Sequence, residues 1–146
     1  MAVVTRAVPP VATMKKIAHP NCVALVDVIA EPESIDEVCL VLELVDGGTS
    51  QPSDASGKPL PLACAAIWSH TRHLLMGLEY LHMSGVVHHD IKPENLLVDK
   101  AGYLTLIDLG LARHVARGVY ISAISRPYLG YISAISRLYL GYVSTS

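Results

Sequence analysis

The sequence predicts an α+β fold in which an antiparallel sheet, one long helix and a small hairpin surround an irregular loop. Three patterns carry this prediction: two β-branched runs at 22–29 and 38–45, apolar residues at helical spacing over 62–84, and a strand-turn-strand signal over 96–107. β-branched runs of this length favour buried strands, whereas steps of three and four residues favour a helix.

The first part of the chain predicts a helix end followed by two strands. Pro9 and Pro10 argue against a helix interior in 1–11, and 13–18 reads as a last helical turn that His19-Pro20-Asn21 stops. The strands at 22–29 and 38–45 are joined by an acidic turn around Pro32. Asp46-Gly47-Gly48 is a turn signal, and 49–61, rich in Ser, Pro, Gly and Asp, is a loop.

The long helix is predicted over 62–84. Ile67, Leu74, Leu78 and Leu81 recur at steps of three to four residues, with Thr71 between them, and Gly85 ends the helix. His70 and His73 lie one turn apart, but no third metal ligand accompanies them, so ordinary side chains of the helix are favoured over a metal site.

The stretch from Val87 to Val98 has the residues that phosphoryl transfer needs. This chemistry requires an acceptor for a hydroxyl proton, a cation near the transferring phosphate and oxygen ligands for Mg²⁺. Asp90, Lys92 and Asn95 supply these three groups. Pro93 discourages a continuous helix through them and favours a loop.

A second metal ligand follows the predicted hairpin. Strands at 96–98 and 103–107 are joined by Asp99-Lys100-Ala101-Gly102, and Asp108-Leu109-Gly110 comes next. The thirteen-residue offset from Asn95 to Asp108 lets the two ligands converge across the hairpin.

Together these two motifs resemble the H-R-D-x-K-x-x-N and D-F-G sequences of eukaryotic protein kinases of the serine/threonine type. The resemblance covers 14–113 and is nearest to the calcium/calmodulin-dependent kinase kinases, through Met-Lys-Lys-Ile-Ala-His-Pro-Asn and Leu-Val-Leu-Glu-Leu-Val. It implies a partial kinase-like fold that uses ATP, Mg²⁺ and a protein substrate. The implied roles are Asp90 as base, Lys92 on the γ-phosphate, Asn95 and Asp108 on the metal, Leu42 as gatekeeper, Glu43 and Val45 as backbone partners of adenine, and Leu97 beneath it.

The sequence departs from the family pattern at several positions. His89 and Leu109 replace the family's Arg and Phe, and Pro10 stands where the C-helix Glu is expected. The glycine-rich loop, the strand-three Lys and the later C-lobe helices have no counterpart. We therefore expect a kinase domain truncated at both ends.

The last part of the chain is repetitive. After an unassigned 1–13 and the partial kinase domain at 14–113, the segment 114–146 carries an eleven-residue repeat that begins with Tyr-Ile-Ser-Ala-Ile-Ser-Arg. Its period is compatible with strands, a helix or disorder. A duplication of low-complexity coding sequence is favoured over an evolved binding array.

The composition limits the cellular compartment and the kinds of partner that we expect for this chain. The net charge of −2 does not indicate the positively charged surface that binds nucleic acid. No apolar run reaches the roughly 18 residues of a membrane span, and 1–16 lacks the apolar core of a signal peptide. Cys22, Cys39 and Cys64 show no C-x-x-C pair, which favours buried reduced thiols in a cytoplasmic protein.

Three hypotheses for function follow. The first is an ATP-dependent protein serine/threonine kinase, inactive or weakly active on its own because ATP positioning is incomplete. The second is a pseudokinase-like interaction module that associates, including with itself, through exposed apolar surface. The third is a truncated gene product without a stable fold.

Overall fold

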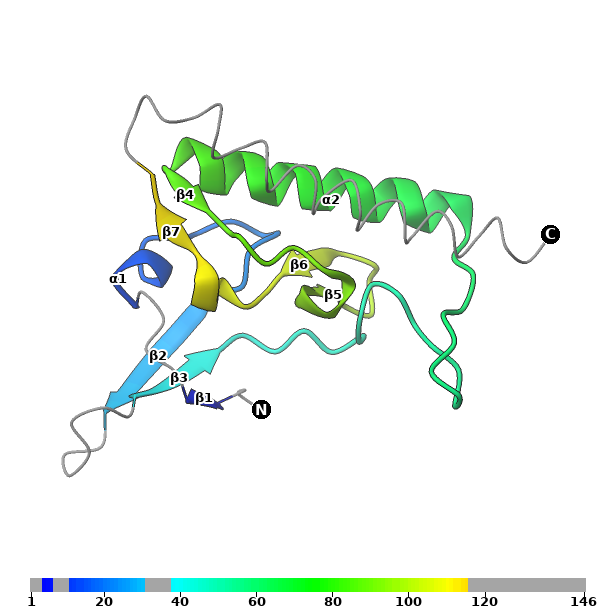
Figure 1. Ribbon diagram of the computed structural model, residues 1–146, viewed down its shortest axis with the longest axis horizontal. Helices are drawn as coiled ribbons and strands as arrows, with labels where there is room; N and C mark the ends of the chain where they lie inside the picture. Colours follow the sequence, from blue (N-terminus) through cyan, green and yellow to red (C-terminus); the bar gives the residue numbers. More distant parts are fainter. Residues whose placement is uncertain (1–3, 7–10, 31–37, 116–146) are drawn as a thin grey trace.

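A computed structural model describes residues 4–6, 11–30 and 38–115, and it confirms the α+β prediction. The helix α2 lies along one side, the three-stranded sheet lies on the other, and the hairpin β5–β6 lies between them (Figure 1). The elements are β1 (Val4–Arg6), α1 (Val11–Met14), β2 (Leu25–Ala30), β3 (Val38–Leu42), α2 (Cys64–Met83), β4 (Val86–Val87), η1 (Pro93–Asn95), β5 (Leu96–Val98), β6 (Leu104–Leu106), η2 (Leu109–Leu111) and β7 (Arg113–His114).

Three predicted features lie outside the described residues. They are the acidic turn around Pro32, Pro10 at the position of the expected C-helix Glu, and the eleven-residue repeat from Tyr120 onward.

The sheet has the order β1-β3-β2, and both pairings are antiparallel. β2 begins at Leu25, three residues later than predicted, because the preceding residues pair elsewhere. Cys22 forms a parallel bridge with Leu106, and the Val23 N–H donates to the Leu106 carbonyl at 2.9 Å. β3 ends at Leu42, where the sequence pattern continues to Val45.

The helix α2 matches its prediction to within two residues at each end. Its buried face contains four of the predicted apolar residues, and Leu74 and Leu81 are completely buried against the hairpin side of the core. The chain leaves the helix through Ser84 and Gly85, whose φ of +70° suits glycine. The helical turn predicted over 13–18 lies earlier in the chain: α1 spans Val11–Met14 and residues 15–16 continue it only as a turn, so the helix ends four residues before the predicted end.

A tight crossing holds the segment after α1 between α2 and β6. The Asn21 carbonyl accepts a hydrogen bond from the Leu106 N–H at 2.9 Å, and Asn21 Nδ2 donates to the Leu104 carbonyl at 2.7 Å. A Cβ on Gly77 would lie 2.8 Å from the Asn21 carbonyl oxygen, so only glycine permits this approach.

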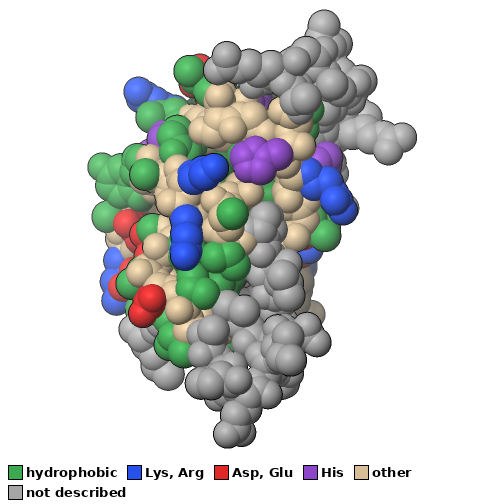
Figure 2. All heavy atoms as spheres, turned by 90° about the vertical axis from the view of Figure 1, so that its left-hand side faces the viewer, with side chains coloured by type: hydrophobic (Ala, Val, Ile, Leu, Met, Phe, Trp, Pro, Cys, Tyr) green, Lys and Arg blue, Asp and Glu red, His purple; other side chains and the backbone are tan. Residues whose placement is uncertain are grey.

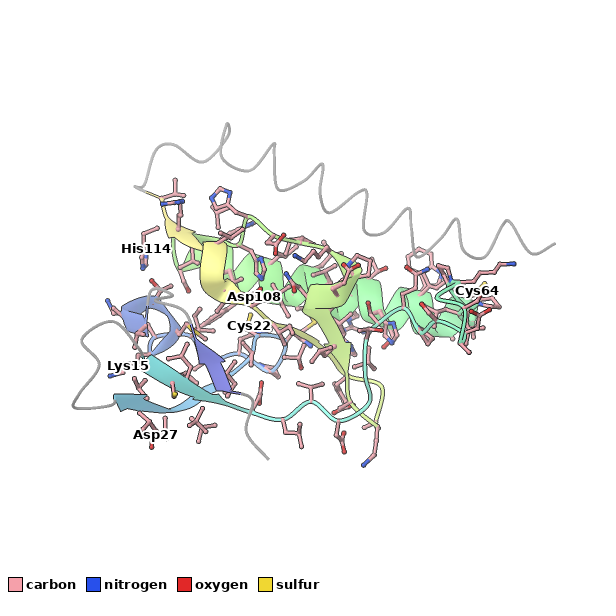
Figure 3. All side chains as sticks on the ribbon, turned by 60° about the horizontal axis from the view of Figure 1, so that its bottom comes forward. Lys15, Cys22, Asp27, Cys64, Asp108 and His114 are labelled. Atoms are coloured by element: carbon pink, nitrogen blue, oxygen red, sulfur yellow. The ribbon has the colours of Figure 1, made fainter. Side chains whose placement is uncertain are left out.

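The three cysteines are free, but only one is fully buried. Cys22 lies in the interior of the molecule and Cys64 at the exposed start of α2 (Figure 3). Burial raises the pKa of the Cys22 thiol to about 12, and this thiol contacts the Gly77 carbonyl at 3.6 Å. The prediction of buried thiols is therefore correct for Cys22 and wrong for Cys64, since the first turn of α2 faces solvent.

Within the described part of the chain, no helix is both long and apolar enough to cross a membrane.

Candidate active site

The loop after β4 turns sharply at His89. This residue is exposed and has a φ of 66°, a left-handed conformation that is uncommon for residues other than glycine. β4 itself is fixed by antiparallel pairing with β7, in which Val87 lies opposite Arg113. Between Lys92 and β5 the only helical element is η1, a single short turn that begins at Pro93. The predicted loop is therefore confirmed.

The side chains of Asp90, Lys92 and Asn95 meet at one carboxylate oxygen. Lys92 Nζ lies 2.6 Å from Asp90 Oδ2, and Asn95 Nδ2 donates to the same oxygen at 2.9 Å. Asn95 Nδ2 also donates to the Asp90 carbonyl at 2.9 Å. Because Nδ2 makes both bonds, Oδ1 is the atom of Asn95 that remains to bind a metal.

These contacts keep Asp90 ionised. The hydrogen bond from Lys92, and then that from Asn95, lowers the pKa of the Asp90 carboxyl, while the same ion pair raises the pKa of Lys92. Asp90 is therefore a carboxylate at neutral pH, with a side chain that is 25% exposed and able to accept a proton from a bound hydroxyl.

His88 joins this loop to the chain after β6. Its ring is fully buried, Nδ1 accepts from the Asp90 N–H at 3.2 Å, and Nε2 lies 3.0 Å from the Ile107 carbonyl. Since Nδ1 accepts, Nε2 carries the proton and donates. Burial lowers the pKa of His88, which keeps the ring neutral in this arrangement.

We expect the protein to lose stability as the pH falls below about 6.5, the ordinary pKa of histidine. The unfolded chain takes up a proton that buried His88 rejects, and burial lowers the pKa of His70 and His82 in the same direction. Denaturant titrations across this range should give a weaker pH dependence for His88→Leu than for the wild type. Equal pH dependence in the two proteins would contradict a role of His88.

The hairpin brings Asn95 and Asp108 together, as the sequence predicted. β5 and β6 pair with Leu96 opposite Leu106, and the Ile107 N–H donates to the Asn95 carbonyl at 2.9 Å. Asp108 has a φ of 59°, and its Oδ1 accepts from the Gly110 N–H at 3.1 Å. This bond orients the carboxylate of Asp108 at the start of η2.

A pocket of about 260 Å³ opens between β3 and the hairpin. Its wall contains all four residues predicted to bind a nucleotide and both predicted metal ligands: Leu42, Glu43, Val45, Leu97, Asn95 and Asp108. Asp90 and Lys92 are not part of the wall, and they adjoin it through the hydrogen bond to Asn95.

The sequence did not identify several other residues of the pocket wall, among them Met14, Val23, Leu40 and Ile107. Val23 and Leu40 belong to the two predicted strand runs, so their membership of apolar strands was visible. Which side of each strand faces the pocket depends on the pairing of residues 22–23 with Leu106, and no local pattern indicates that pairing.

Asn95 and Asp108 suit a magnesium ion that is also held by phosphate oxygens. Mg²⁺ is usually bound by one or two protein ligands together with substrate phosphates and water. No cluster of three or more His, Cys, Asp or Glu among the described residues suits a metal by itself. His73 is occupied otherwise, since its Nδ1 accepts from the Leu104 N–H at 3.3 Å and its ring stacks on Tyr103.

The segment after the pocket is attached to the hairpin. The Val98 N–H donates to the Gly48 carbonyl at 2.8 Å, and the Ser50 N–H donates to the Leu96 carbonyl at 2.7 Å. Lys100 Nζ lies 2.7 Å from Asp46 Oδ2. These contacts fix the wall at 43–45 relative to Leu97.

Basic side chains gather on the end of the molecule where α1, β4 and β7 meet. Figure 2 shows Lys, Arg and His side chains over the upper part of this face and most of its acidic side chains at the lower left. Lys15, Lys16 and Arg113 are exposed.

Comparison with known proteins gives a consistent result. Residues 5–130 match the family model of the protein kinase domain. A calcium/calmodulin-dependent protein kinase kinase of Caenorhabditis elegans is 41% identical over 104 residues, covering 70% of this chain and 18% of that protein. The serine/threonine-protein kinase ssp1 of Schizosaccharomyces pombe is 39% identical over 102 residues, covering 70% of this chain and 15% of that protein. GRIK1 of Arabidopsis thaliana is 41% identical over 100 residues, which is 24% of its length. The chain thus spans less than a quarter of these curated relatives.

Proposed function

The chain belongs to the protein kinase family, and from this premise we propose that it binds Mg²⁺-ATP and takes part in phosphoryl transfer to a serine or threonine hydroxyl of a protein. One observation carries the proposal. The nucleotide-binding residues expected from the sequence and both expected metal ligands line a single pocket, and Asp90 is hydrogen-bonded to one of those ligands.

Different residues of the pocket wall would contact different parts of the adenine ring. Leu97 would lie beneath adenine and Leu42 would line the pocket as gatekeeper, and the Glu43 carbonyl and Val45 backbone groups would provide the hydrogen-bond partners of adenine. The Glu43 side chain is occupied elsewhere, since Oε1 accepts from the Ala24 N–H at 2.9 Å. That bond holds the backbone of Glu43 beside Ala24.

The reacting groups lie next to this pocket. Asn95 Oδ1 and the Asp108 carboxylate would hold Mg²⁺, which when bound neutralises phosphate charge. Asp90 would accept the proton of the attacking hydroxyl, and Lys92 would place its ammonium near the transferred phosphate. Lys92 must exchange part of its bond with Asp90 for this contact, which its 44% exposure permits.

The proposal is tested by the thermal stability of the chain with Mg²⁺-ATP. A ligand present at a hundredfold excess over its dissociation constant should stabilise the folded protein by about 2.7 kcal/mol. We expect this shift in the wild type and its loss in Asp108→Ala. Asp27→Ala, which removes an exposed carboxylate on β2 (Figure 3), should keep it.

The alternative of a non-catalytic interaction module makes a different prediction. A shift that is equal in the wild type and Asp108→Ala would mean that metal-bound phosphates are not held there. Absence of a shift would mean that this pocket takes no nucleotide. Either result would contradict the proposal and favour the interaction module.

A further inference from the structure

We propose that the free edge of β2 is a pairing surface for the β2 strand of a second copy of this chain, and that Asp27 keeps this edge unpaired. The inference does not depend on nucleotide binding. It rests on the place of β2 in the sheet, on a hydrogen bond that Asp27 accepts, and on the exposed apolar side chains beside it.

The strand β2 lies at one edge of the three-stranded sheet. It pairs with β3 on one side, and no strand among the described residues pairs with its other side. An edge strand presents a row of unpaired N–H and C=O groups, which can form hydrogen bonds with a strand of another chain. At six residues, Leu25–Ala30 is as long as an ordinary strand and offers such a row.

Asp27 occupies one of the N–H groups of this edge. The Val28 N–H donates to Asp27 Oδ1 at 2.7 Å. Because an antiparallel pair uses the N–H groups of alternate residues, and this one bonds to a side chain, we infer that it faces away from β3. Figure 3 shows Asp27 at the outer margin of the sheet, on the side away from α2. The carboxylate therefore competes with any strand that approaches this edge.

The side chains beside Asp27 favour pairing. Val26 is 66% and Ile29 51% exposed, whereas Leu25 and Val28 pack against the core. Exposed apolar side chains on an edge strand promote association, and natural proteins oppose it with charged residues and β-bulges. Both are present here, since the register with β3 shifts between Leu25 and Asp27.

A second copy fits this edge because antiparallel pairing of two identical strands is self-complementary. A two-fold axis at Val28 would place Val28 of each copy opposite Val28 of the other, and the two residues would exchange a pair of hydrogen bonds. The same register would place the two Asp27 carboxylates on one face, as diagonal neighbours about 7–8 Å apart. In the wild type the carboxylates thus occupy both central N–H groups and repel each other.

Sedimentation velocity of the full chain over a range of concentrations tests the proposal with Asp27→Ala. This change frees one N–H group in each copy, and a hydrogen bond at each corresponds to about tenfold in an equilibrium constant. We therefore expect dimerisation about a hundredfold stronger than in the wild type, with slower hydrogen exchange at Val28 as the dimer forms. The matched control is Asp54→Ala, which removes an exposed carboxylate that accepts from the N–H groups of Ser56 and Lys58 in a loop. It should associate no more than the wild type.

A second variant locates the contact. Asp27→Ala combined with Val28→Pro lacks the central N–H group, and proline is tolerated on an edge strand where that group faces solvent. This variant should return to the association of the wild type. No residue of β2 lines the nucleotide pocket, so the nucleotide-dependent shift should persist in Asp27→Ala whatever its association.

Three results would overturn the proposal. Asp27→Ala that associates no more than the wild type or Asp54→Ala would show that the carboxylate does not protect the edge. A dimer of Asp27→Ala that persists with Val28→Pro would place the contact on another surface. Hydrogen exchange at Val28 that does not change with the concentration of Asp27→Ala would do the same, and this readout does not require the proline variant to fold.

Discussion

Replacing Leu74 by alanine is expected to lower the free energy of unfolding by about 2–5 kcal/mol. Leu74 is completely buried in the middle of α2, in the cluster that also contains Leu81, Leu104 and Leu106. The change removes apolar contacts and leaves a cavity between α2 and the hairpin, and packed neighbours fill such cavities only partly. Because small domains are stable by about 5–15 kcal/mol, this loss is a large fraction of the total.

The measurement is urea denaturation followed by far-ultraviolet circular dichroism. The matched control is Leu111→Ala, which removes the same atoms from a side chain that is 56% exposed. Its effect should stay within about 0.5 kcal/mol. Equal changes for the two leucines would show that α2 is not packed on the hairpin in solution.

The importance of Leu74 was visible in the sequence because helical periodicity is a local property. The spacing of Leu74, Leu78 and Leu81 determines which face of α2 is buried, and Gly85 marks its end, so the structure confirms both. The hairpin was equally predictable, since β5 and β6 are neighbours joined by a short turn. Local patterns of this kind survive in the folded chain when tertiary contacts do not oppose them.

The boundaries of the first two strands were not predictable in the same way. Residues 22–23 have the composition of a strand, but they pair with Leu106, more than eighty residues later. They are therefore not part of β2. The left-handed backbone of His89 is likewise imposed by its surroundings, because nothing in the residue type requires it. Long-range pairing decides these features.

The residues of the candidate site were predictable from their chemistry. Asp90, Lys92, Asn95 and Asp108 are residue types that phosphoryl transfer uses, at spacings that a loop and a hairpin can bring together. Their arrangement in space was less so: His88 attaches the loop to Ile107 across 19 residues, and Met14 lines the pocket from a distant part of the chain.

The attachment of the pocket wall to the hairpin gives the second large effect. Gly47→Ala is expected to destabilise the protein by about 1–3 kcal/mol. An added Cβ would lie 2.3 Å from the Val98 carbonyl oxygen and 2.7 Å from the Asp99 carbonyl carbon. Both are backbone atoms of the hairpin, so no side chain can move aside and the segment must separate from β5.

Hydrogen exchange locates this separation without relying on nucleotide binding. The N–H groups of Ser50 and Val98 donate across the same junction, to Leu96 and Gly48, and both should exchange faster in Gly47→Ala. Residues 43–45 precede the junction and line the pocket, so any ligand of the pocket should also bind more weakly.

Gly57→Ala separates steric contact from backbone strain. Gly57 has a φ of +81°, and nothing lies within 4 Å of its added Cβ, so alanine there meets only an unfavourable conformation in an exposed loop. It should lower stability modestly and leave exchange at Ser50 and Val98 unchanged. Unaltered exchange in Gly47→Ala would contradict the junction, because the close approach of Gly47 to the hairpin requires those two hydrogen bonds to weaken when the segment moves.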